Sequence, residues 1–204
     1  MLCVRLLYKS KSLTIDYFNK FPENDYILGP GDTVNVIVSR DYQELTSITT
    51  IDGDTTGTIT VSNNINITGS AAQITSAVAV IDNFSATPSA TLDDAHTLAQ
   101  LKAINNAISG TISLNDYTVA LEGSTSDVKA ALAGTFGAAY TGNVTLNDAN
   151  TTSIAATDIT TIEGDTTGTI TVSNNINLTG TSAQIAAAVD DVNTFSGSPT
   201  AALS

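Results

Sequence analysis

Apolar residues alternate with threonine and asparagine in several short stretches of the chain. In "TGTITVSNNINL" (167–178), Ile170 and Val172 are separated by threonine, and the apolar residues of "NINL" are separated by asparagine. A period of two is typical of strands that bury one face. Asn174 and Asn175 suit a turn between the two stretches, because asparagine tolerates positive φ. We therefore expect two short strands joined by a turn.

Other apolar residues recur at intervals of three or four, which is the spacing of one buried helix face. The stripes predicted to be buried are Leu98, Leu101, Ile104 and Ile108; Ile74, Val78 and Ile81; Val128 and Leu132; and Ile185, Val189 and Val192. Three helix starts carry candidate caps, namely Ser70–Gln73, Thr181–Gln184 and Ser124–Asp127. The first two fit the S/T-x-x-Q capping box, whereas aspartate in the third is a shorter reach-back partner.

A long stretch of the chain occurs twice. Residues 50–92 align without gaps on 161–203, 111 positions later, and about two thirds of the aligned positions are identical. "TLDDA" at 91–95 returns as "TLNDA" at 145–149, a shift of 54 positions, which divides the longer separation into two units. A unit of this size with short strands and thin helices cannot bury its own apolar face, whereas stacked units can.

We therefore predict a mixed α and β repeat protein, in which short β-strands alternate with short helices in an irregular, solenoid-like stack of about 55-residue units. The repeat region spans 54–204, with a partial unit at 54–90 and units at 91–144 and 145–204. Two tandem small domains that fold independently are the alternative. Since the chain begins and ends within a unit, we expect a fragment of a longer protein or the product of a decayed gene. Open repeat ends would allow self-association.

Composition and charge narrow the possible functions. The formal net charge is −13, and only seven residues are Lys or Arg. A nucleic-acid binder needs cations against the phosphates, so we expect no nucleic-acid partner. No apolar run approaches the ~20 residues of a membrane helix, so we expect no transmembrane helix. The N-terminus lacks the features of a signal peptide, and the single Cys3 can form no intramolecular disulfide.

One N-terminal stretch, residues 25–53, carries a recognisable motif, "DYILGPGDTVNVIVSRDYQELTSITTIDG". It resembles the start of the Wza-type family of bacterial outer-membrane polysaccharide export proteins, whose export domain opens with Tyr-x-Leu-Gly-Pro-Gly-Asp. The matching residues are Tyr26, Leu28, Gly29, Pro30, Gly31 and Asp32. The resemblance implies a truncated export-domain-like β stub, because the chain changes to the repeat after Gly53. We expect the preceding residues 1–24 to be poorly ordered.

The repeat body resembles the Thr/Asn/Asp-rich arrays of large bacterial surface or secreted proteins, a resemblance that implies no chemistry. We expect a non-enzymatic module with a structural or adhesive role at the cell surface, in the extracellular space or at the outer membrane. Its expected partners are polysaccharide or other surface components. The alternative is a component or remnant of an outer-membrane polysaccharide export protein.

No set of acid, base and nucleophile stands out, so no catalytic or cofactor-binding residue is predicted. The candidate calcium ligands are Asp52, Asp54, Glu163 and Asp165, from "DGD" and "EGD". Hard cations prefer carboxylate oxygens, but neither the EF-hand spacing nor the Gly-rich nonapeptide is present. Turn chemistry and helix N-terminal charge are the alternative explanations for these acidic residues. We expect His96, the only histidine, to be an exposed polar residue at the first turn of a helix.

Overall fold

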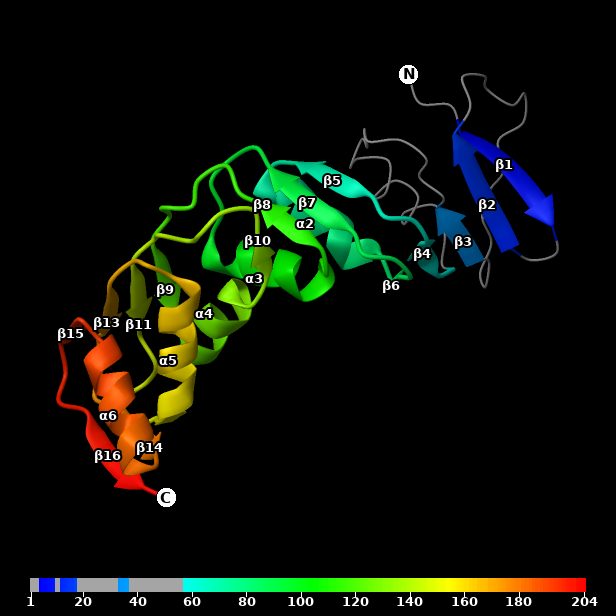
Figure 1. Cartoon of the computed structure of the whole chain (residues 1–204). Coiled ribbons are helices and arrows are strands. Elements are labelled where there is room, and N and C mark those ends of the chain that lie inside the picture. Colours follow the sequence, from blue (N-terminus) through cyan, green and yellow to red (C-terminus); the bar gives the residue numbers. More distant parts are fainter. Residues whose placement is uncertain (1–3, 10–11, 18–32, 37–56) are drawn as a thin grey trace.

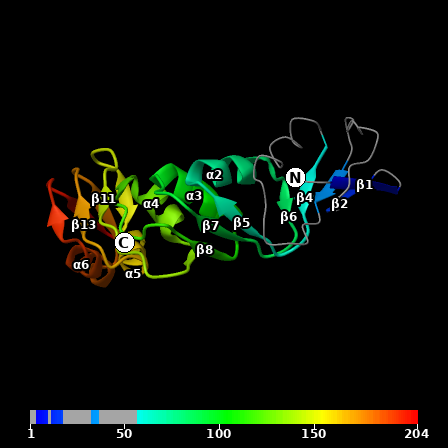
Figure 2. The same cartoon turned by 90° about the horizontal axis from the view of Figure 1, so that it is seen from above.

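The computed structural model describes residues 4–9, 12–17, 33–36 and 57–204. It confirms the mixed α and β class, because short helices alternate with short strands throughout 57–204. Figure 1 shows an elongated, curved arrangement, with β1 at one end and β16 at the other. In the view from above, the described elements again follow one another along the length of the molecule (Figure 2).

The described strands are β1 (Val4–Lys9), β2 (Ser12–Tyr17), β3 (Thr33–Val36), β4 (Ile59–Val61), β5 (Asn66–Gly69), β6 (Asn83–Phe84), β7 (Ser89–Leu92), β8 (Thr111–Ser113), β9 (Leu121–Gly123), β10 (Thr135–Phe136), β11 (Val144–Leu146), β12 (Ser153–Ala155), β13 (Ile170–Val172), β14 (Asn177–Gly180), β15 (Thr194–Phe195) and β16 (Thr200–Leu203). The described helices are α2 (Ala71–Val80), α3 (Leu98–Ala107), α4 (Thr125–Leu132), α5 (Ala156–Asp165) and α6 (Ser182–Asp191). The apolar–threonine alternation forms half-buried strands as predicted, since Ile170 and Val172 are buried and Thr171 is partly exposed.

From β4 onward, each described strand pairs in parallel with strands from the preceding or following pass of the chain. Ala90 of β7 lies beside Ile112 of β8, and Val144 of β11 lies beside Ile170 of β13. The strand orders are β1-β2-β3-β4-β6, β5-β7-β8-β10, β9-β11-β13-β15 and β12-β14-β16. The chain therefore returns alongside itself after each helix, as parallel pairing requires a crossover connection.

The predicted turn at Asn174–Asn175 does not join two strands of one sheet. β13 pairs with β11 and β15, whereas β14 pairs with β12 and β16, so the two strands belong to different sheets. Neither asparagine has a positive φ. The expectation of a tight turn was wrong here because the chain bends at a corner between two sheets and both strands find their partners in other segments.

The buried apolar side chains form one cluster that runs from Ile59 to Val192. The helices pack against one another in chain order, α2 on α3 and so on to α6. Two tandem domains that fold independently would each have a separate core. The single continuous cluster does not agree with that alternative. The units defined by the sequence at 91–144 and 145–204 each hold two helices, so the chain returns alongside itself about twice in each unit.

The helix caps are mostly as predicted. Complete capping boxes start α2 at Ser70 and α6 at Thr181, and the Ser124 hydroxyl accepts the N–H of Asp127 without the reciprocal bond. Thr97 and Gln100 form a further complete box at the start of α3. The signal T-x-x-Q was present in the sequence, so this cap was predictable from the same rule.

One predicted core residue is exposed. Val189 in α6 is 47% exposed, whereas Val78, at the equivalent position of the repeated text in α2, is 7% exposed. The difference arises because α2 packs against the following helix α3, whereas α6 packs against the preceding helix α5. Sequence periodicity indicates which face of a helix is apolar but not which neighbour covers it.

Of the N-terminal segments, the structure describes only three strands. β1 and β2 lie within residues 1–24 and pair antiparallel, and β3 lies within 25–53. β3, which the alternating pattern of "TVNVIVS" predicts, pairs in parallel with β4 at the start of the repeat region. The motif residues 26–32 lie outside the described residues.

Two leucines at equivalent positions of the repeated text test how far burial depends on the neighbouring segment. Leu92 is 2% exposed and Leu203 is 72% exposed. We expect Leu92→Ala to lower the free energy of unfolding by about 2–5 kcal/mol. Leu203→Ala should change it by no more than about 0.5 kcal/mol. Urea denaturation followed by circular dichroism measures both, and equal losses would contradict the observed packing.

Candidate functional site

A shallow groove of about 390 Å³ lies between α3 and α4. Its lining residues are Leu98, Ala99, Lys102, Ala103, Asn106 and Asp127. The apolar part of the wall comes from α3 and includes Leu98, which also packs against the core, and the charged groups come from both helices. An open groove with this mixture of groups is a candidate binding surface.

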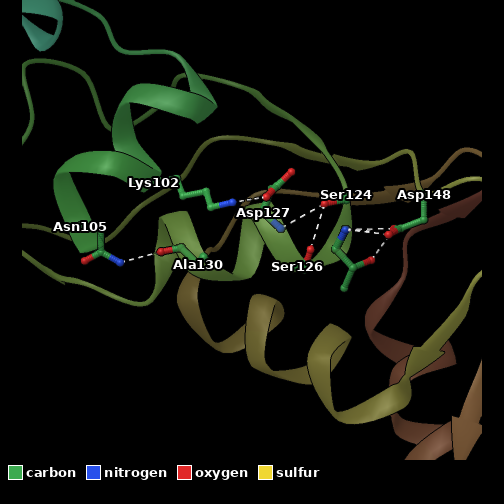
Figure 3. A network of polar contacts seen from close by, with 8 residues as sticks. Lys102, Asn105, Ser124, Ser126, Asp127, Ala130 and Asp148 are labelled. Carbon is green, nitrogen blue, oxygen red and sulfur yellow. Dashed lines mark hydrogen bonds and ion pairs between the residues drawn. The ribbon is translucent and has the colours of Figure 1, made fainter. Parts of the chain in front are cut away.

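An ion pair crosses the groove. The Lys102 ammonium donates to a carboxylate oxygen of Asp127, and the two side chains are 39% and 42% exposed. This hydrogen bond, and a second one from Ser124, lower the pKa of Asp127. Figure 3 shows the pair bridging α3 and α4.

The same arrangement occurs between the next two helices. Lys129 of α4 donates to Asp158 of α5, so in both cases the fifth residue of one helix pairs with the third residue of the next. Below the Lys102 pair, the Asn105 amide donates to the backbone oxygen of Ala130 at 2.6 Å (Figure 3). These contacts hold adjacent helices at a fixed offset along their axes.

The N-terminus of α4 is closed by a carboxylate from a later segment. Asp148, which follows β11, accepts the Thr125 N–H at 3.0 and 3.1 Å and the Thr125 hydroxyl at 2.6 Å. Asp94 accepts the N–H of Ala71 in α2 in the same way, again from 23 residues further along the chain. A carboxylate at this position satisfies an unpaired N–H and favours the helix dipole.

The groove presents polar groups beside an apolar wall. The ion pair keeps a second carboxylate oxygen and further ammonium hydrogens for a polar partner, beside the Asn106 amide and an alanine-lined wall. Within residues 57–204, no group of three or more His, Cys, Asp or Glu side chains is placed to hold a metal ion.

The candidate calcium ligands are only partly described. Asp52 and Asp54 lie outside the described residues. Glu163 and Asp165 lie in the last turn of α5, so neither a turn between elements nor a helix N-terminus accounts for them. Residues two apart on a helix point in different directions, so these two carboxylates do not converge. Burial raises the pKa of Asp165.

His96 is buried, at 4% exposure, which overturns its expected place on an exposed first turn. Its Nε2 lies 3.2 Å from the Tyr140 hydroxyl, and that hydroxyl donates to the backbone oxygen of Val119 at 2.6 Å. Burial lowers the pKa of His96. No local sequence signal could reveal this contact, because the tyrosine lies far along the chain and the pair has no counterpart in the repeated text.

The helices of residues 57–204 are eight to ten residues long, and none of them is long and apolar enough to cross a bilayer. This finding agrees with the sequence prediction for the described part of the chain.

Asp148 provides a test of the cap supplied by the later segment. We expect Asp148→Ala to lower the free energy of unfolding by about 1–2 kcal/mol, because the N-terminus of α4 loses its acceptor and a favourable charge. Asp148→Asn keeps an acceptor oxygen and should lose clearly less. Urea denaturation of both variants measures the difference, and an unchanged midpoint for the alanine variant would contradict this role.

The Lys102–Asp127 pair should contribute little to stability, because both side chains are over one third exposed. In a double-mutant cycle with Lys102→Ala and Asp127→Ala, we expect a coupling free energy of no more than about 1 kcal/mol. The coupling should decrease as salt is raised from about 0.05 to about 1 M, since ions screen exposed pairs. A larger coupling that salt does not affect would mean that the pair is shielded from solvent.

Comparison of the chain with protein-family models, with curated proteins and with solved structures finds no match.

Proposed function

We propose that this chain is a non-enzymatic structural or adhesive module of a bacterial surface or secreted protein, built as an irregular solenoid-like stack. The observation that carries the proposal is the use of polar side chains. Asparagine and aspartate residues bond backbone groups of the adjacent pass of the chain, instead of gathering around a reactive centre.

These contacts recur at equivalent places in the two copies of the repeated text. In the first copy, Asp82 accepts the N–H of Ile59 at 2.8 Å, and in the second, Asn193 accepts the N–H of Ile170 at 2.6 Å. Asn64 accepts the N–H of Thr87, and its equivalent Asn175 accepts the N–H of Ser198. The partners in all four contacts are 23 residues apart. These contacts give the asparagine and aspartate residues a structural role, because their side chains bond the backbone of the adjacent segment.

The size of the elements supports the same proposal. Strands of two to four residues in 57–204 are too short to be stable alone, and each is completed by neighbours from adjacent segments. Stability in such an arrangement comes from contacts between nearest neighbours, as in solenoid proteins. An extended surface follows from this construction, and it suits contact with polysaccharide or other surface components.

The proposal includes self-association through an open edge. β16 is the edge strand of its sheet, and all four of its residues are exposed. An unpaired strand edge is a template for pairing with another chain.

The second candidate function is a component or remnant of polysaccharide export. It is favoured by the motif at 26–32 together with the parallel pairing of β3, which follows that motif, with β4. This pairing would join the export-like segment to the repeat region in one sheet.

Surface labelling separates these proposals from an internal location. Antibodies raised against residues 57–204 should label intact cells of the producing bacterium, and protease treatment of intact cells should remove the label. Labelling only after permeabilisation would contradict the surface role. Deletion of the gene should leave the amount of surface polysaccharide unchanged if the role is structural, whereas a loss of polysaccharide would favour the export function.

A further inference from the structure

His96 and Tyr140 form a buried contact between two connecting segments that lie outside the sheets. His96 lies in the connection from β7 to α3, and Val119 in the connection from β8 to β9. Tyr140 lies between β10 and β11. The sheet β5-β7-β8-β10 ends here and the sheet β9-β11-β13-β15 begins. A change in this contact therefore acts on the junction of two sheets.

The hydrogen bonds fix which nitrogen of His96 carries the proton. The Tyr140 hydroxyl has one hydrogen, and the Val119 carbonyl at 2.6 Å can only accept it. Nε2 of His96 must then donate to the tyrosine oxygen at 3.2 Å, which leaves Nδ1 as an unprotonated acceptor. Nδ1 is buried and has no hydrogen-bond partner. The site is thus built for a neutral imidazole.

Protonation would place a hydrogen on Nδ1, where nothing accepts it, and a charge inside the protein. Both changes are unfavourable in a buried site. Two carboxylates act in the opposite sense, Asp94 in the same connection and Asp116 in the β8–β9 connection, and burial outweighs them in lowering the pKa of His96. Tyr140 faces the ring as a neutral phenol, because burial raises its pKa.

Tyr140 is closely packed on its own side of the contact. A Cβ at Gly142 would lie 2.7 Å from Cε1 of Tyr140 and 2.0 Å from the Val119 oxygen, so the tyrosine ring is packed directly against the backbone. The other side of the contact is the connection at 93–97, which leads directly into α3. It contains Thr97, whose hydroxyl caps α3.

We infer that His96 is an acid-sensitive latch, which when neutral holds the connection at 93–97 and the start of α3 against Tyr140, and when protonated separates from Tyr140 towards the Asp116 carboxylate. The sign follows from linkage. A histidine whose folded pKa lies below its unfolded value of about 6.5 stabilises the fold above that value. This contribution is lost as the pH falls from about 6.5 towards the folded pKa.

The chain has a single histidine, so an NMR titration of its imidazole in the untagged protein, from pH 8 to 5, reports on His96 alone. We expect a midpoint below 6.5 and a change in the amide signals of residues 97–101 at the same midpoint. Asp116→Asn should lower the midpoint further, since it removes a negative charge that stabilises the imidazolium. A midpoint at or above 6.5, or amide signals that do not respond, would overturn the inference.

A stability measurement gives an independent readout. The free energy of unfolding should fall between pH 7.5 and 5.5 in the unchanged chain, and His96→Asn, which introduces the residue found at the equivalent position 150, should lose that dependence. Equal pH dependence in both proteins would contradict the latch. If the variant does not fold, the titration of the unchanged chain still decides the question.

Discussion

The fold depends on lateral pairing between successive passes of the chain. Strands of two to four residues satisfy few backbone hydrogen bonds and cover little apolar surface by themselves. From β4 onward, each described strand pairs in parallel with strands from the preceding or following segment, and the helices cover the interior that these strands form. The core is consequently one long cluster, and the stability of any segment depends on its neighbours.

The same constraint explains the side chains that would otherwise suggest a site. Parallel pairing leaves backbone N–H groups at the corners between sheets and at helix starts, and an unpaired buried N–H is costly. Asp94 and Asp148 satisfy helix N-termini, while Asp82 and Asn193 satisfy strand starts. The acidic and amide residues are thereby committed to holding segments together. The groove between α3 and α4 is lined by an ion pair that also aligns the two helices.

His96 and Tyr140 depart from this regular use of polar groups. His96 and Tyr140 are further apart in sequence than the partners of the recurring contacts, and His96 keeps a buried nitrogen without a hydrogen-bond partner. Buried unsatisfied groups are uncommon in proteins, so this one distinguishes the junction between the two sheets from the rest of the core. Because the neutral form of His96 holds this junction, the packing between the two sheets depends on pH.

The sequence by itself determined the features that depend on near neighbours. Alternation at Ile170 and Val172 predicted strands, the spacing from Leu98 to Ile104 predicted a helix, and Ser70 and Thr181 predicted caps, because each signal involves residues within one or two turns of chain. Only the tertiary structure decided which strands share a sheet, why Val189 is exposed when Val78 is not, and that His96 is buried. These outcomes depend on which distant segment lies alongside, and nearly identical local text gave different burial where that neighbour differed.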